Sequence, residues 1–411
     1  MDNKLLLELA QRHGTPLYVF DEECLKSRIA SLRASLPAKT GICYAMKANP
    51  FVLPAVSHLV DRIEVCSEGE QRICADLSID SEKLVISGVN KDEDAIRESI
   101  KVQGAAGRYT VESVGQFNMI YRIARSCNAR LKILLRLTSG NQFGMDEWTI
   151  KELASLYGSD PYLDLCGIQY FSGTQKKSLG RIGKEIDLLG DLVFELQRES
   201  DLYIREVEYG PGFPVDYFDD RPRQEVEAEE KAFLEQVSML MPKMRTRRRI
   251  ILELGRAIVA SCGTYATRVV DTKTNGGENY AIVDGGIHHL TYYGNSLALK
   301  KPPCRLVHDK DDQQAAVIQP WTVCGSLCTV NDLLVKRAEF RGLGQGSLLA
   351  FEQTGAYCMT EGISLFLSRD LPEIVVVDGL GRSRTVRARL PTSPVNTPQT
   401  PISWTSTRKD G

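Results

Sequence analysis

The sequence has few aromatic residues, few histidines and almost no excess of charge of either sign. Aromatic residues make up 7% of the 411 residues, there are 5 histidines, and the formal net charge is −2. A charge this close to zero gives no basic surface for nucleic acid, so we expect no nucleic-acid partner. No apolar run approaches the roughly 20 residues of a membrane-spanning helix, so we expect no membrane partner. Without a secretory leader, the 11 cysteines predict a cytoplasmic protein with reduced thiols.

The sequence also lacks the ligand spacing of a metal site. Cys324 and Cys328 have no second cysteine pair with which to complete a structural zinc site. His288 and His289 are adjacent, and on a strand they would point to opposite faces. We therefore expect no bound metal.

The first two thirds of the chain contain eight apolar segments of strand length, with amphipathic helical stretches between them. These segments are 41–47, 62–67, 83–88, 107–112, 130–137, 164–171, 205–210 and 249–255. Eight alternating units predict an α/β fold of the (β/α)8 TIM-barrel type. In such a barrel the functional residues lie at the carboxyl ends of the strands.

Beyond the barrel, the pattern changes to strands without long helices between them. We expect these strands at 263–271, 279–284, 315–323, 348–352 and 373–377, together with an early strand at 17–20. The predicted division is a cofactor-binding barrel over 22–262 and a β domain built from 1–21 and 263–389. Residues 390–411 are rich in Pro, Ser and Thr, a composition that predicts a mobile tail.

Lys47 is the leading candidate for chemistry, because it ends the first predicted strand in the segment YAMKANP. A lysine held there by rigid backbone and partly desolvated would have a lowered pKa, so that its neutral amine could form a Schiff base. Strands also often end in a solvated lysine. The same register puts other chemically useful residues at strand ends, and these are Ser67, Glu112, Arg136, Phe171, the turn 210–213, Glu253 and Arg256. A lysine, a carboxylate and a glycine turn on one rim are suited to a phosphorylated aldehyde cofactor.

Motifs from GTPLYVFD at 14–21 to TGAY at 354–357 together resemble the fold type III pyridoxal-phosphate decarboxylases. This family contains diaminopimelate decarboxylase and eukaryotic ornithine decarboxylase. YAMKAN is similar to the family's lysine motif and GIQYFSGTQ to its sixth-strand motif. EYGPGFPV is similar to the glycine phosphate loop, ELGR to the EPGR motif, and CGSLCTVND to the cysteine motif.

The resemblance implies pyridoxal 5′-phosphate as the cofactor, bound by Lys47, with Glu253 keeping the pyridine nitrogen protonated. It implies that Phe171 stacks on the ring. The residues expected around the phosphate are Thr174, Gly210, Gly212, Arg256 and Tyr357. In the family the motif cysteine comes from the partner subunit and helps to reprotonate Cα. The resemblance therefore makes Cys328 a catalytic candidate and implies a homodimer with active sites shared across its interface.

Phe171, Pro211 and Thr329 are among the residues that depart from the family pattern. Phe171 stands where the family usually has a histidine, and Pro211 replaces the middle glycine of the phosphate loop, which removes a backbone donor. Thr329 follows the motif cysteine where decarboxylases of diamino acids carry an acidic residue. Without that carboxylate a buried distal ammonium would be unpaired, so free lysine, ornithine and diaminopimelate are less favoured as substrates.

The segments FSGTQ, QFGMDE, VDGGIHH and SLCTVND are similar to the biosynthetic branch that decarboxylates siderophore precursors, such as citryl-diaminopropionate, or a glutamyl group on a carrier protein. We therefore expect a small-molecule or acylated amino-acid substrate, whose reacting end is an ordinary α-amino acid and whose far end is large, acylated or anionic. Candidate substrate-binding residues are Arg136, Asp284, Thr329 and Asp332. For Asp284 and Asp332 a turn or capping role is an equal alternative. Diaminopimelate decarboxylation, a non-catalytic regulatory relative, and a racemase or cofactor carrier remain as alternatives for the whole chain.

Overall fold

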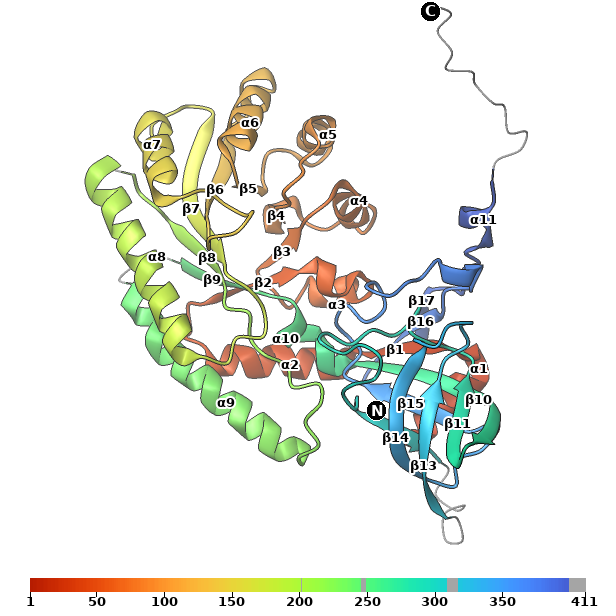
Figure 1. The fold of residues 1–411 in the computed structure, drawn as a ribbon. Helices are drawn as coiled ribbons and strands as arrows, with labels where there is room; N and C mark the ends of the chain where they lie inside the picture. The colour runs from red at the N-terminus through yellow and green to blue at the C-terminus, as the bar shows by residue number, and fades with distance from the viewer. Residues whose placement is uncertain (201, 245–248, 309–316, 399–411) are drawn as a thin grey trace, which may run out of the picture.

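The computed structural model describes residues 1–200, 202–244, 249–308 and 317–398, which form a barrel and a second sheet (Figure 1). Eight parallel strands close the barrel in chain order, so the predicted (β/α)8 fold is confirmed. The barrel strands are β2 Gly41–Ala45, β3 Arg62–Val65, β4 Leu84–Ile86, β5 Arg108–Val111, β6 Leu131–Leu137, β7 Leu163–Phe171, β8 Glu206–Gly210 and β9 Arg249–Leu254. Each lies within one residue of the predicted start, because buried strands leave an unbroken apolar run in the sequence.

Helices surround the barrel, and α2, α4, α5, α6 and α7 among them begin at a side chain that caps the helix. The helices are α2 Glu22–Ser35, α3 Leu53–Val56, α4 Glu68–Asp76, α5 Glu93–Gln103, α6 Val114–Ser126, α7 Glu147–Tyr157, α8 Leu179–Ser200, α9 Arg223–Leu240 and α10 Arg256–Val259. Ser67 accepts a hydrogen bond from Glu70 N at the start of α4, and Ser113 does the same for Gln116 N in α6. Ser67 on the barrel rim is therefore a helix cap.

The second sheet has nine strands, and it joins the two ends of the chain. The strand β1 Leu17–Asp21 pairs antiparallel with β10 Gly263–Asn275 and parallel with β16 Glu373–Val377. The remaining strands are β11 Glu278–Val283, β12 Cys304–Val307, β13 Ile318–Cys324, β14 Leu333–Arg341, β15 Leu348–Glu352 and β17 Ser383–Arg387. Three of them (β12, β14 and β17) were not predicted. Helix α1 Asn3–His13 buries Leu6 and Leu9 against this sheet.

The predicted tail begins with ordered residues. Leu390 bridges to Leu371, Thr392 is buried and donates to Arg369 O at 2.9 Å, and α11 spans Ser393–Asn396. The mobile tail therefore does not start at residue 390 as predicted, since these residues have backbone and side-chain partners. Residues 399–411, and residues 315–316 of one predicted strand, lie outside the described part of the chain. Among the described helices, none has the length and apolar character needed to cross a membrane.

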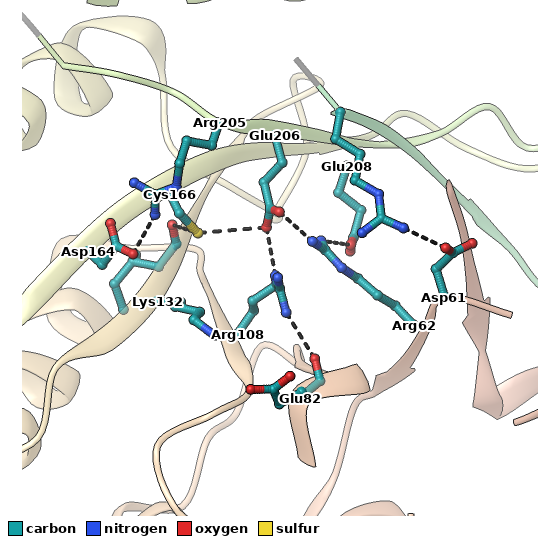
Figure 2. Close-up of polar contacts among 12 residues, drawn as sticks. Asp61, Arg62, Glu82, Arg108, Lys132, Asp164, Cys166, Arg205, Glu206 and Glu208 are labelled. Atoms are coloured by element: carbon teal, nitrogen blue, oxygen red, sulfur yellow. Dashed lines mark hydrogen bonds and ion pairs between the residues drawn. The ribbon is translucent and has the colours of Figure 1, made fainter. Parts of the chain in front are cut away.

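A buried charged layer closes the barrel at the amino ends of its strands (Figure 2). Arg62 on β3 lies between two carboxylates of β8: it pairs with Glu206, and its Nη1 is 3.3 Å from Glu208 Oε2. Arg108 on β5 donates to Glu206 Oε1 at 2.8 Å. The side chains of Cys43, Val85, Leu134, Cys166 and Ile251 form a small cluster that contacts this layer, since Cys166 Sγ lies 3.7 Å from Glu206 Oε1. The floor of the barrel is thus held by ion pairs among three strands.

The two carboxyls of this layer differ in their pKa. Burial raises the pKa of Glu208 to about 8, since Arg62 only partly offsets it and the negative charges of Glu253 and Glu64 add to the rise. Burial also opposes ionisation of Glu206, but Arg62 and Arg108 outweigh it and hold its pKa below the usual value. Neutral Glu208 is therefore favoured in the folded chain at pH 7.

We expect Glu208→Gln to stabilise the protein at about pH 8 but not at about pH 4.5. The unfolded chain ionises Glu208 near its ordinary pKa and the folded chain only near 8, so the wild type loses stability as pH rises through this window. The neutral variant escapes this loss, which is on the order of 2–4 kcal/mol. Thermal unfolding of the cofactor-free protein at both pH values measures the difference. Glu206→Gln is the matched control: its native pKa is lowered, so that variant should become relatively less stable as pH rises. Equal destabilisation by both variants at both pH values would refute the assignment.

Candidate active site

Lys47 lies just beyond the carboxyl end of β2, in the short helical turn Met46–Ala48. Its Nζ donates to Glu64 Oε2 at 2.6 Å and lies 3.8 Å from Glu253 Oε1. Glu64 belongs to β3 and Glu253 to β9, the two strands that flank β2 in the barrel. Both carboxylates are buried, whereas the Lys47 side chain is 42% exposed toward the open end of the barrel. The amine is thus fixed at one point of the rim by two neighbouring strands.

The predicted lowering of the Lys47 pKa is wrong for the chain by itself. Burial does act to lower this pKa, but the charges of Glu64 and Glu253 outweigh it and raise the pKa well above its ordinary value. The sequence could not reveal this, because the two carboxylates come from strands 17 or more residues away. In the chain by itself, Lys47 is therefore an ammonium ion, and it stays one as long as Glu64 and Glu253 keep their negative charge.

Glu253 is the second charged group of this rim. Gln169 on β7 donates to its Oε2 at 2.9 Å. Burial and the negative charge of Glu64 raise the pKa of Glu253 to about 7, against the opposing effect of Lys47. Glu253 is thus close to half-protonated at neutral pH, so a nearby ring nitrogen could share its proton.

A tight glycine turn follows β8 on the same rim. Gly212 has φ +61°, and a Cβ added to it would lie 2.1 Å from Gly173 O, so only glycine fits. A Cβ on Gly210 would lie 2.5 Å from Cδ2 of Phe171, which shows how closely this turn packs on the ring. Pro211 lies between them and has no N–H to donate. The backbone of Gly212 thus packs directly on that of Gly173, at a point that also lines a cavity.

Arg256 lies among tyrosine rings at the start of α10. Its guanidinium carbon is 4.6 Å from the ring centres of both Tyr293 and Tyr357, and its Nη1 donates to Tyr217 Oη at 2.7 Å. Its buried Nε has no hydrogen-bond partner within the described residues. Tyr357 is tied to the lysine turn, because its N–H donates to Ala48 O at 2.7 Å. A buried guanidinium with a free N–H beside a glycine turn fits an anionic group such as phosphate.

These features surround one cavity of about 260 Å³ between the barrel rim and loops of the second sheet. The predicted residues that line it are Lys47, Phe171, Thr174, Gly212, Glu253, Arg256 and Tyr357. The prediction missed Tyr293 and Glu361, whereas it included Phe213 only as part of the rim turn 210–213. This cavity fits pyridoxal phosphate, because a lysine, a titratable carboxyl and an aromatic ring line it. The residues suited to the phosphate are Thr174, Gly212 and Arg256, which we call the anion cradle.

The other predicted residues do not line this cavity. Arg136 donates to Glu112 Oε1 at 3.0 Å and lies 4.8 Å from the ring centre of Phe143. Asp284 accepts from Thr15 Oγ1 at 2.5 Å, from Thr267 Oγ1 at 2.6 Å and from a backbone N–H. These contacts agree with a turn or capping role for Asp284, which was the alternative to substrate binding.

The cysteine motif forms a loop whose centre is Asp332. The Asp332 carboxylate accepts from Ile287 N at 2.8 Å and Leu327 N at 2.7 Å. Thr329 is partly exposed and Cys328 is exposed. Asp332 therefore shapes the loop from within, while the loop presents Cys328 outward.

Lys91 is a rim residue that sequence reasoning missed. Its Nζ donates to Gly88 O at 2.7 Å and lies 3.3 Å from Gln116 Oε1. Burial lowers its pKa to about 8, opposed by Glu112. Nothing in the segment GVNKDED distinguishes it from an exposed loop lysine.

His288 and His289 lie in a turn after β11, and their ring centres are 3.7 Å apart, so they do not point to opposite faces of a strand as predicted. Within the described ranges, no group of three or more His, Cys, Asp or Glu side chains is arranged to hold a metal.

Comparison with known proteins gives a consistent match. A family model described as "Pyridoxal-dependent decarboxylase, C-terminal sheet domain" matches residues 17–355. Diaminopimelate decarboxylase of Vibrio cholerae is 28% identical over 404 residues, covering 93% of this chain and 92% of its own. The L-glutamyl-[BtrI acyl-carrier protein] decarboxylase of Niallia circulans is 24% identical over 398 residues, covering 90% and 91%. The crystal structure of diaminopimelate decarboxylase from Helicobacter pylori complexed with L-lysine has the same fold, with a TM-score of 0.81, 23% identity and coverage of 95% and 98%.

Proposed function

Because the chain belongs to the family of pyridoxal-dependent decarboxylases, we propose that it removes the α-carboxylate of an amino-acid moiety as carbon dioxide. The observation that carries this proposal is the position of Lys47. Its amine lies 3.8 Å from the Glu253 carboxylate at the wall of a cavity that also contains Gly212 and Arg256.

When bound, pyridoxal phosphate supplies a ring that accepts the electron pair left on Cα as carbon dioxide departs. Lys47 would hold the cofactor through its aldehyde group at the cavity wall. Glu253, buried and oriented by Gln169, holds a proton at the ring nitrogen. Phe171 covers one face of the cavity, where an aromatic ring stacks without contributing charge.

The phosphate end is bound by a different set of residues. Arg256 offers its free Nε–H, Gly212 offers backbone that no side chain covers, and Thr174 offers a hydroxyl. Tyr357 links this end to the Lys47 turn through Ala48 O. Lys47 and Arg256 would thus hold the cofactor at two separate points of the cavity wall.

The proposed assembly is a cytoplasmic homodimer in which each subunit completes the other's active site. Cys328 does not line the cavity of its own subunit, and the neighbouring Val330 is 89% exposed. Large apolar side chains are also exposed shortly after the cavity residue Glu361, namely Ile363, Leu365, Phe366 and Leu367. A second copy would cover these side chains and bring its Cys328 to the cavity, where the thiol returns a proton to Cα.

The proposed substrate is an amino acid whose far end is acylated or otherwise large, as in siderophore or other specialised-metabolite biosynthesis. Thr329 supports this, because no carboxylate stands next to Cys328 to pair with a distal ammonium, and the Asp332 carboxylate of the same loop accepts from Ile287 N and Leu327 N. A relative named as a decarboxylase of a carrier-bound glutamyl group also supports it. The second candidate is diaminopimelate decarboxylation, which the names of several relatives favour.

A carbon dioxide release assay on the cofactor-saturated protein tests these candidates. We expect release from acylated 2,3-diaminopropionate or a carrier-bound glutamyl group, and little from free lysine, ornithine or meso-diaminopimelate. Turnover of meso-diaminopimelate alone would replace the substrate proposal with the second candidate. Deuterium exchange at Cα without gas release would identify a racemase. Neither reaction with any substrate would favour a non-catalytic regulator.

A further inference from the structure

A buried ion pair lies behind the two loops that form the anion cradle. We define loop A as residues 172–176, after β7, and loop B as residues 210–215, after β8. Lys176 of loop A is 4% exposed, and its Nζ donates to Glu185 Oε2 of helix α8 at 2.6 Å. The same Nζ donates to Ser172 Oγ at 2.9 Å. The ammonium group thus joins both ends of loop A to the helix behind it.

Glu185 is held by three further donors. Tyr209, the residue before loop B, donates to Oε2 at 2.6 Å, and Ser172 donates to Oε1 at 2.5 Å. Arg181 Nε donates to Oε1 at 3.2 Å. Burial works against ionisation of Glu185, but these donors and Lys176 keep its pKa below the usual value. One carboxylate therefore connects loop A, the strand end before loop B, and α8.

The two loops are also joined directly to each other. Lys176 N donates to Gly212 O at 2.9 Å. Gln175 bonds to both backbone groups of Val215, accepting from its N–H at 2.6 Å and donating to its C=O at 2.9 Å. Since Thr174 and Gly212 line the cavity, any shift of Lys176 would move the cradle.

We propose that Lys176 and Glu185 are positioning residues for the cofactor phosphate, acting through the backbone of loops A and B. This inference rests on the proposed function. A buried ion pair is seldom a good source of stability, since an apolar pair of similar volume often does as well. Here the side-chain hydrogen bonds of Lys176 and Glu185 all go to loop A, to the strand end before loop B, or to α8. In addition, Pro211 has no N–H, so loop B has one backbone donor fewer. With fewer donors, each remaining one has to be aimed accurately at the phosphate.

The test compares cofactors with and without a phosphate group. Apoprotein carrying Lys176→Met is titrated with pyridoxal phosphate and with pyridoxal, following absorbance of the bound cofactor, and with inorganic phosphate as a competitor. We expect the affinity for pyridoxal phosphate to fall by about 10- to 100-fold and that for pyridoxal to change by less than about 2-fold. A merely structural role would weaken both to the same extent.

Lys177→Met is the matched control. Lys177 follows loop A directly and pairs at 2.7 Å with Asp216, which follows loop B directly, but this pair is exposed. Exposed pairs contribute little, so the control should bind both cofactors as the wild type does. If Lys176→Met fails to fold, the apolar double variant Lys176→Met/Glu185→Leu and the milder Tyr209→Phe provide the measurement.

The outcomes separate this inference from the proposed function. Wild-type affinity for pyridoxal phosphate in folded Lys176→Met, or an equal loss for both cofactors, overturns the positioning role alone. Failure of the wild type itself to bind pyridoxal phosphate overturns the proposed function, and the inference with it.

Discussion

Lys47→Ala is expected to abolish covalent capture of pyridoxal phosphate and to lower carbon dioxide release by at least about 10³-fold. Lys47 is the one lysine that lines the cavity within the described part of the chain. Borohydride reduction of the cofactor-saturated protein, followed by peptide mass spectrometry, should find the adduct on Lys47 in the wild type. The variant should show none. An unmodified Lys47 in saturated wild-type protein would shift the assignment to a non-catalytic relative.

Lys91→Met is the control for lysine reactivity. Lys91 has a pKa lowered to about 8, so it is chemically able to attack an aldehyde, yet it does not line the cavity. Its variant should keep the Lys47 adduct. A lost adduct in Lys91→Met, with the fold intact, would show that attachment requires Lys91 and that the position of Lys47 alone does not decide it.

Mixing two inactive variants tests the shared active site. A dimer of Lys47→Ala with Cys328→Ala contains one cavity that keeps both Lys47 and the partner's intact thiol. Random exchange of subunits makes half of the dimers mixed, so the mixture should recover about a quarter of the wild-type activity. No recovery after proven exchange would mean that each subunit supplies its own cysteine.

The strand positions could be read from the sequence because a buried parallel strand leaves a local apolar run. The rim residues followed from them, since the carboxyl ends of parallel strands meet at one edge of the barrel. Lys47, Glu253 and Arg256 were found in this way and do meet around one cavity. The arrangement depended only on strand order, and neighbouring barrel strands are consecutive in the chain.

Features that depend on closure of the barrel could not be predicted. The rise in the Lys47 pKa needs Glu64 and Glu253 from the strands on either side. Arg62 and Glu208 read as ordinary charged residues in a strand, and only the closed barrel shows that they are buried together. Lys176 and Glu185 likewise read as a solvated loop and helix surface. Burial of a charge leaves no mark in a single sequence when its partner is distant in the chain.

Glu253→Gln is expected to lower kcat by about 10²–10³-fold with a smaller effect on cofactor affinity. Glutamine keeps the shape of the side chain and a hydrogen bond with Gln169. It cannot become a carboxylate, however, so it provides no negative charge to keep the ring nitrogen protonated. The electron pair left on Cα would then have a poorer acceptor. Steady-state kinetics and cofactor titration of the variant separate the two effects, and Glu253→Asp, which retains a carboxyl, should keep more activity.

The same variant has an independent signature in the cofactor-free protein. The pKa of Glu253 is raised to about 7 in the folded chain, so the wild type loses stability as pH rises from its ordinary pKa toward 7. Glu253→Gln should lack this loss and unfold at a higher temperature than the wild type at about pH 8, with no such gain near pH 4.5. If the variant keeps full kcat yet shows this stability change, Glu253 is a buried acid without a role at the ring nitrogen. If kcat falls and the variant also gains stability at about pH 8, the Glu253 carboxyl accounts for both effects. Its buried position raises its pKa, and the same position lies in the wall of the cavity.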